Sequence, residues 1–191
     1  MGKGRLEAFS DGVIAVALTI MVLDLKAPHG MDLAALRALL PDFLSYVLSF
    51  VFVGIYWSNH HHLLHTVKHV TGDILWANLH LLFWITLFPF CTAWISEDHG
   101  AAVPTALYGI VLLMAAIAWT ILQSRILKHE GAASLLGRAV GADFKGKASL
   151  LGYAMSIPVA FVQPWVSDAL FVAVALMWLV PDRRIESLVR E

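Results

Sequence analysis

Long apolar stretches recur along this chain, and they restrict its fold more than any other feature of the sequence. A helix that crosses a bilayer needs about 20 predominantly apolar residues, within a range of roughly 17 to 25. The 191 residues are 59% hydrophobic and only 14% charged, a balance that is not typical of soluble globular domains. We therefore predict an all-α membrane protein that crosses the bilayer several times and has little mass outside it.

We divide the apolar residues into six spans and treat residues 1–191 as a single transmembrane domain. The last apolar block, residues 148–180, is too long for one spanning helix and too short for two complete ones. Pro158 and Pro164 favour two short helices that meet there in a tight turn. The predicted spans cover about residues 6–25, 43–64, 74–95, 103–127, 147–163 and 166–180.

Basic residues are distributed unequally between the two sides of the membrane that these spans define. An even number of spans puts both termini on one side, and all but two of the 13 lysines and arginines fall there. Only Lys26 and Arg37 fall on the other side. Because cytoplasmic loops carry the excess of positive charge, we predict that both termini are cytoplasmic.

The first span begins with a polar cluster and continues as a run of apolar and small residues. Charged groups such as Arg5 and Asp11 are costly near a bilayer, and they usually persist where they are paired or line a water-filled path. At 3.6 residues per turn, one face then carries a stripe of Gly12, Val16, Thr19 (or Ile20) and Leu23. Such a stripe suits close packing between helices. It also suits a pore lining, which in so small a chain requires symmetric copies. Periodicity alone favours packing and leaves both interpretations open.

Three short motifs occur near the ends of the first three spans. Arg5-x-x-x-Phe9-Ser10-Asp11 begins the first span, Trp57-x-x-His60-His61 lies late in the second, and Trp76-x-Asn78 lies early in the third. Together with the six-span plan, these motifs resemble the transmembrane protein 175 family. That family consists of potassium channels of prokaryotic membranes and of animal lysosomes and endosomes. The resemblance covers essentially the whole chain and implies a potassium channel of the prokaryotic plasma membrane.

By this resemblance, a chain with one six-span set forms a homotetramer whose first helices line a central pore. The constriction of that pore and its threonine correspond to Val16, Thr19, Ile20 and Leu23 here, and Val16 is smaller than the Leu or Ile usual in the family. Asp24 follows at the outer end, where a carboxylate can concentrate cations at a pore entrance. The resemblance also implies a structural hydrogen-bond network of Arg5, Phe9, Ser10 and Asp11 with His61, Trp76 and Asn78. No span carries an arginine ladder, so we expect a leak-type conductance without a voltage sensor.

Two other functions remain open on the residues alone. A proton-coupled or other secondary cation transporter would use Asp11, Asp24 and the histidines as titrating groups. A membrane metal or haem protein would use the His60–His69 cluster, in which three histidines recur every four residues, a spacing that can bind zinc.

Motifs of other protein classes are absent from the sequence. It contains no Gly-x-Ser-x-Gly, no His-Glu-x-x-His and no phosphate-binding loop, so we predict that the protein is not an enzyme. The Thr-Val-Gly-Tyr-Gly filter of ordinary potassium channels is also absent, so any preference for potassium must arise from another geometry. We predict that the protein has no cofactor and no nucleic-acid partner, and that K⁺ is the permeant ion. The expected partners are potassium ions, the lipid bilayer and further copies of the chain.

Overall fold

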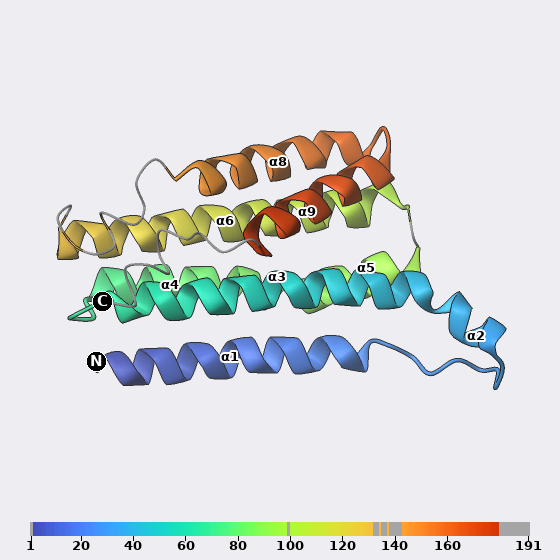
Figure 1. Ribbon diagram of the computed structural model, residues 1–191, viewed down its shortest axis with the longest axis horizontal. Helices are drawn as coiled ribbons and strands as arrows, with labels where there is room; N and C mark the ends of the chain where they lie inside the picture. The colour runs from blue at the N-terminus through green and yellow to red at the C-terminus, as the bar shows by residue number, and fades with distance from the viewer. Residues whose placement is uncertain (1, 99, 132–133, 135–136, 138–142, 180–191) are drawn as a thin grey trace.

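The computed structural model describes residues 2–98, 100–131, 134, 137 and 143–179, and these residues contain helices and connections but no strand. The prediction of an all-helical chain is therefore confirmed for them. The long helices run side by side along the longest axis of the molecule (Figure 1). The helices are α1 (Lys3–Leu23), α2 (Leu33–Ala38), α3 (Leu40–His65), α4 (Gly72–Ile85), α5 (Phe88–Glu97), α6 (Ala102–Glu130), α8 (Phe144–Ala160) and α9 (Pro164–Leu179).

Within the described residues, four helical segments are long and apolar enough to cross a bilayer, judged by length and composition. They are Lys3–Leu23, Leu40–His65, Gly72–Glu97 and Ala102–Glu130. The fifth and sixth spans stay a prediction, because α8 has 17 residues and α9 has 16. Helices of that length are roughly 25 Å long, which is shorter than the hydrocarbon core of about 30 Å.

The third of these segments is two helices rather than the single helix that its hydropathy predicts. Helix α4 ends at Ile85, and α5 begins at Phe88 with Pro89 in its first turn. Proline has no backbone N–H to donate to the preceding turn, so the helix ladder is interrupted there. The hydroxyl of Thr86 donates to the carbonyl of Phe83 at 2.7 Å and so binds one of the carbonyls at the end of α4.

Helices α8 and α9 form the predicted hairpin, with Pro164 as the first residue of α9, whereas Pro158 lies inside α8. The chain turns at residues 161–163, where the amide of Gln163 donates to the carbonyl of Val159 at 2.8 Å. The buried hydroxyl of Ser167 in α9 donates to the carbonyl of Ser156 in α8 at 2.7 Å, which joins the two arms. Helix α6 approaches α8 closely at Gly109, where an added Cβ would lie 2.7 Å from Ser156 Oγ.

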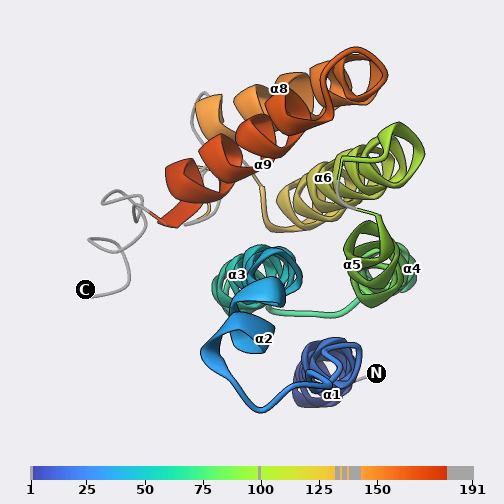
Figure 2. The same cartoon turned by 90° about the vertical axis from the view of Figure 1, so that its right-hand side faces the viewer.

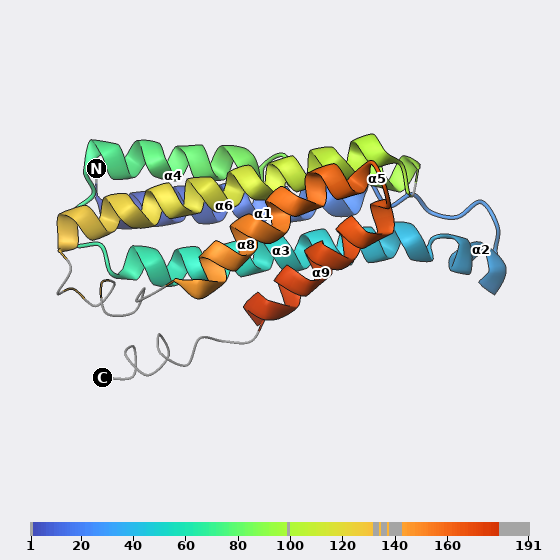
Figure 3. The ribbon, with the colours of Figure 1, turned by 90° about the horizontal axis from the view of Figure 1, so that it is seen from above.

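Seen end-on, the molecule places α1 and the α8–α9 hairpin on opposite sides of the bundle (Figure 2). Helix α1 packs against α3, α4 and α5, whereas the hairpin packs against α6 and α3. Viewed from above, α8 and α9 cross obliquely over the longer helices (Figure 3). Helix α1 is therefore covered on one side only.

Part of the predicted topology lies outside the described residues. This holds for the C-terminal segment 180–191 and for Arg138, Arg183, Arg184 and Arg190, which contribute to the charge asymmetry. The cytoplasmic position of both termini stays a prediction.

Candidate pore helix and its supporting contacts

The exposed face of α1 carries the candidate pore residues. Val16, Ile20 and Leu23 are 55%, 45% and 78% exposed in the protomer. Gly12 and Thr19 are exposed as well. The buried residues lie on the opposite face: Leu6, Ser10, Ile14, Ala17 and Met21. The exposed stripe therefore lies outside the buried core of the protomer, although the periodicity of the sequence favoured packing.

A groove of about 830 Å³ lies between this exposed face of α1 and helix α5. Its walls are mostly apolar, with Val16 and Ile20 contributed by α1 and Phe90 by α5. Asp24, directly beyond the last residue of α1, is one of the lining residues. The groove is large enough to receive side chains of a further helix.

A buried chain of hydrogen bonds joins α1 to α4 and α3. The amide nitrogen of Asn78 (Nδ2) in α4 donates to Ser10 Oγ in α1 at 2.9 Å. The hydroxyl of Ser10 donates in turn to the carbonyl of Leu6 at 2.8 Å. Because Nδ2 of Asn78 is the donor to Ser10, its Oδ1 must accept, and the Nε2–H of His60 in α3 fills that role at 2.6 Å. No fully buried side-chain nitrogen or oxygen in the described residues lacks a hydrogen-bond partner, which a buried network requires.

Asp11 lies outside this chain of bonds and has a different partner. Its Oδ1 accepts a hydrogen bond of 3.0 Å from the indole Nε1 of Trp57 in α3. The network predicted from the sequence did not include Trp57, so this contact was missed. The signal that could have found it is the spacing of Trp57 and His60, which are three residues apart and so lie on one helical face opposite Ser10 and Asp11.

The structure does not bring the other predicted network residues together. Phe9 is 49% exposed and Trp76 is 72% exposed. Arg5 is also exposed, and it forms no ion pair with any residue in the described part of the chain. His61 is exposed, and its neighbour His60 occupies the buried position in its place. One residue along a helix turns the side chain by roughly 100°, which is why the sequence alone does not distinguish the two.

The spacing of His61, His65 and His69 suggested that all three share one helical face, and the structure keeps only the first two on the helix. Helix α3 ends at His65, and Thr66 is its C-cap, so His69 lies beyond the helix. His60 is engaged with Asn78, whereas His61 and His65 are exposed. No group of three or more metal-ligating side chains is assembled among the described residues. The set of three histidines, His61, His65 and His69, that the metal or haem alternative predicts is therefore not assembled.

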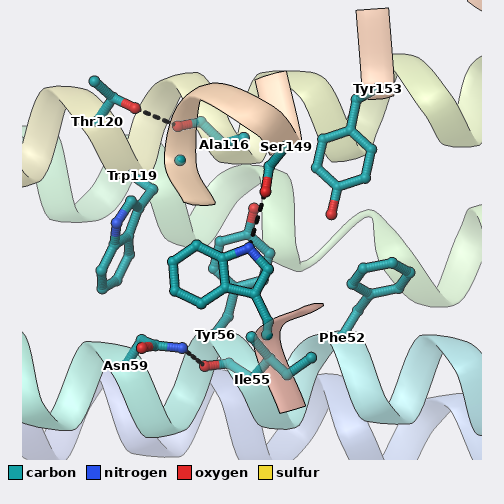
Figure 4. Close-up of a pocket in the computed structure, with 11 residues that line it drawn as sticks. Phe52, Ile55, Tyr56, Asn59, Ala116, Trp119, Thr120, Ser149 and Tyr153 are labelled. Carbon is teal, nitrogen blue, oxygen red and sulfur yellow. Dashed lines mark hydrogen bonds between the residues drawn. The ribbon is translucent and has the colours of Figure 1, made fainter. Parts of the chain in front are cut away.

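A second, smaller cavity lies on the far side of α3 from α1 (Figure 4). It has about 40 Å³ of free space and is lined by residues of α3, α6, α8 and α9. Trp119 of α6 and Tyr153 of α8 form part of its aromatic wall, and the indole of Trp178 donates to Ser149 Oγ at 2.9 Å. No residue of α1 lines it, so this cavity is separate from the candidate pore face.

Comparison with known proteins identifies the family. The family profile described as "Endosomal/lysosomal potassium channel TMEM175" matches residues 5–89. A potassium channel of Chryseobacterium sp. (strain P1-3) is 53% identical over 191 residues, which is 100% of both chains. A potassium channel of Streptomyces collinus is 34% identical over 173 residues, which cover 84% of this chain and 83% of that protein.

A solved structure is similar over almost the whole fold. It is the crystal structure of a lysosomal potassium-selective channel TMEM175 homolog from Chamaesiphon minutus, with a TM-score of 0.79 and 29% sequence identity. The match covers 93% of this chain and 96% of that one. The family consists of ion channels rather than enzymes, and with its apolar spans this chain is an integral protein of a prokaryotic membrane. These matches, together with the fold and the contacts of α1, show that the chain belongs to the TMEM175 family.

Proposed function

We propose that this protein is a homotetrameric potassium channel of the leak type, with a central pore lined by four copies of α1. The observation that carries this proposal is the stripe of α1, whose residues stay exposed in the protomer. Bacterial relatives named as potassium channels support the choice of ion. The exposed α1–α5 groove supports the assembly, because a neighbouring copy would bury it.

The alternative position for this stripe is the lipid, and the polar groups on the same face of α1 argue against it. Thr19 is exposed on the stripe, and the exposed Asp24 lines the groove at its end together with Val16 and Ile20. A helix face that meets hydrocarbon does not favour a carboxylate at its end and a hydroxyl within it. Placed at an axis, the same groups meet water and ions.

The hydroxyl group of Thr19 is oriented so that its oxygen can act as an acceptor on the exposed side of α1. Its hydroxyl proton is donated to the carbonyl of Val16 at 2.9 Å, so the lone pairs of Oγ1 remain available on the exposed side. In a tetramer, four such hydroxyls form a ring of acceptors. A ring of oxygen acceptors can replace part of the hydration shell of a cation, which is how channels without a carbonyl filter can hold K⁺.

Apolar side chains on either side of Thr19 form the proposed constriction. Val16 and Leu23 are seven residues apart, which is roughly 10 Å along a helix. A narrow apolar passage of that length gates by excluding water. Since Val16 is the smallest of these side chains, we place the narrowest points at Ile20 and Leu23.

Cysteine accessibility in proteoliposomes tests the pore assignment. The only native cysteine, Cys91, is buried (1% exposed), so Leu23→Cys introduces a single accessible thiol. A charged methanethiosulfonate reagent should then reduce potassium flux through the variant and leave the unmodified chain unaffected. Ile110→Cys on α6, where the native side chain is 39% exposed, is the control and should not respond. Unchanged flux after verified labelling of Leu23→Cys would show that α1 does not line the conduction path.

A further inference from the structure

Two exposed histidines lie against each other at the C-terminal end of α3. His61 and His65 are one helical turn apart, and their ring centroids are 4.6 Å apart with the ring planes at 76°. Neither takes part in the buried network that joins α1, α3 and α4. We propose that His61 and His65 together bind a divalent transition-metal ion, with Zn²⁺ as the reference ion, at a site separate from the pore stripe.

The separation of the rings suits a shared metal ion. Zinc binds imidazole nitrogen at about 2.0–2.1 Å, which places the ring centroid about 3.2 Å from the metal. Two rings on one ion then have centroids roughly 4.5 Å apart at a right-angled N–Zn–N geometry and roughly 5.2 Å apart at a tetrahedral one. The observed 4.6 Å falls within this interval. Histidines at positions i and i+4 of a helix are a recurrent pair of zinc ligands for this reason.

The last turn of α3 is held in place by α1. Nζ of Lys3 donates to the carbonyl of His65 at 3.0 Å and lies 3.8 Å from Glu7 Oε1. This contact fixes the final residue of the helix, where an unrestrained end would fray. Holding His65 within reach of His61 reduces the entropy that the pair would lose on binding an ion.

The chemical type of the ligating atoms determines which metal ions the site can bind. Two imidazoles suit zinc, copper, nickel and cobalt, whereas magnesium and calcium prefer oxygen ligands. No third protein ligand is assembled with this pair in the described residues, so water fills the remaining coordination positions. Such an open site binds reversibly and is weaker than a closed structural zinc site.

Titration calorimetry on the purified full chain in detergent, with any affinity tag removed, tests the site directly. Zinc chloride should give a saturable binding heat, and magnesium chloride should give none. His61→Ala and His65→Ala should each weaken zinc binding about tenfold or more. His62→Ala is the matched control: it is exposed, adjacent in sequence and 5.6 Å from the His61 ring, but it lies outside the i, i+4 pair.

Thermal melting separates loss of the site from loss of the fold. Zinc should raise the melting temperature of the native chain and of His62→Ala, because a ligand of the folded state stabilises it. The double variant His61→Ala/His65→Ala should melt normally without zinc and show no rise with it. Equal weakening by His62→Ala, or zinc binding that survives in the double variant, would overturn the proposal. Neither measurement depends on conduction. A failure of the proposed metal site can therefore be distinguished from a failure of the proposed channel function.

Discussion

Replacing Asn78 by leucine removes the central member of the hydrogen-bond chain that joins α1, α3 and α4. Asn78, Ser10 and His60 are buried, with 0%, 0% and 1% of their surfaces exposed. The substitution keeps a similar side-chain volume, leaves the His60 Nε2–H without an acceptor and leaves Ser10 without a donor. Ser10 keeps its bond to the Leu6 carbonyl, so His60 carries most of the cost.

The expected loss of stability follows from the hydrogen bonds that the substitution removes. A buried donor without a partner costs about 1–3 kcal/mol. Individual hydrogen bonds between membrane helices contribute about 0.6 kcal/mol on average and up to about 1.7 kcal/mol, because the unfolded chain also finds partners in the membrane. We therefore expect Asn78→Leu to lower the free energy of unfolding by about 1–3 kcal/mol.

A double-mutant cycle with Ser10→Ala isolates the bond between the two side chains. The assay is reversible unfolding of the purified protein in mixed micelles, followed by circular dichroism. The double variant should lose less free energy of unfolding than the sum of the two single losses, by about 0.5–2 kcal/mol, because both substitutions remove the same bond.

Two matched controls accompany this cycle. Asn59→Leu removes a side-chain bond that α3 makes only to its own Ile55 carbonyl, and Ser124→Ala removes a bond that α6 makes only to its own Thr120 carbonyl. Each should change the free energy of unfolding by less than about 0.5 kcal/mol. Additive effects of Asn78→Leu and Ser10→Ala would refute the network as a stabilising link between helices.

Further substitutions test the helix contacts and the constriction. Gly109→Ala places a Cβ 2.7 Å from Ser156 Oγ and should lower the free energy of unfolding by about 1–3 kcal/mol. Gly54→Ala, where no atom lies within 4 Å, should instead raise the free energy of unfolding by up to about 1 kcal/mol in the same assay. Ile20→Asn should increase potassium flux into liposomes several-fold, because a polar side chain admits water to an apolar constriction. Ile110→Asn, on an exposed site of α6, should leave the flux per correctly folded protein unchanged, and an equal increase there would contradict the pore assignment.

The sequence by itself determined the class of the protein and the location of its main helices. Hydropathy over about 20 residues is a local property, because a segment that enters a bilayer must satisfy its own backbone hydrogen bonds. The hairpin of α8 and α9 was also predictable, since the restrictions that proline imposes are local. The motif that begins at Arg5 identified the family without any knowledge of tertiary contacts.

Only the tertiary structure decided which side chains meet. The sequence placed His60 and His61 side by side, and the rotation of α3 against α4 put His60 on Asn78 and left His61 exposed. The sequence did not show that Asp11 pairs with Trp57, since 46 residues separate them and no local pattern fixes the register of two packed helices. The stripe of α1 was ambiguous for the same reason. Periodicity shows that residues share a face, but what that face meets depends on where the other helices pack, and here they leave the stripe of α1 exposed in the protomer.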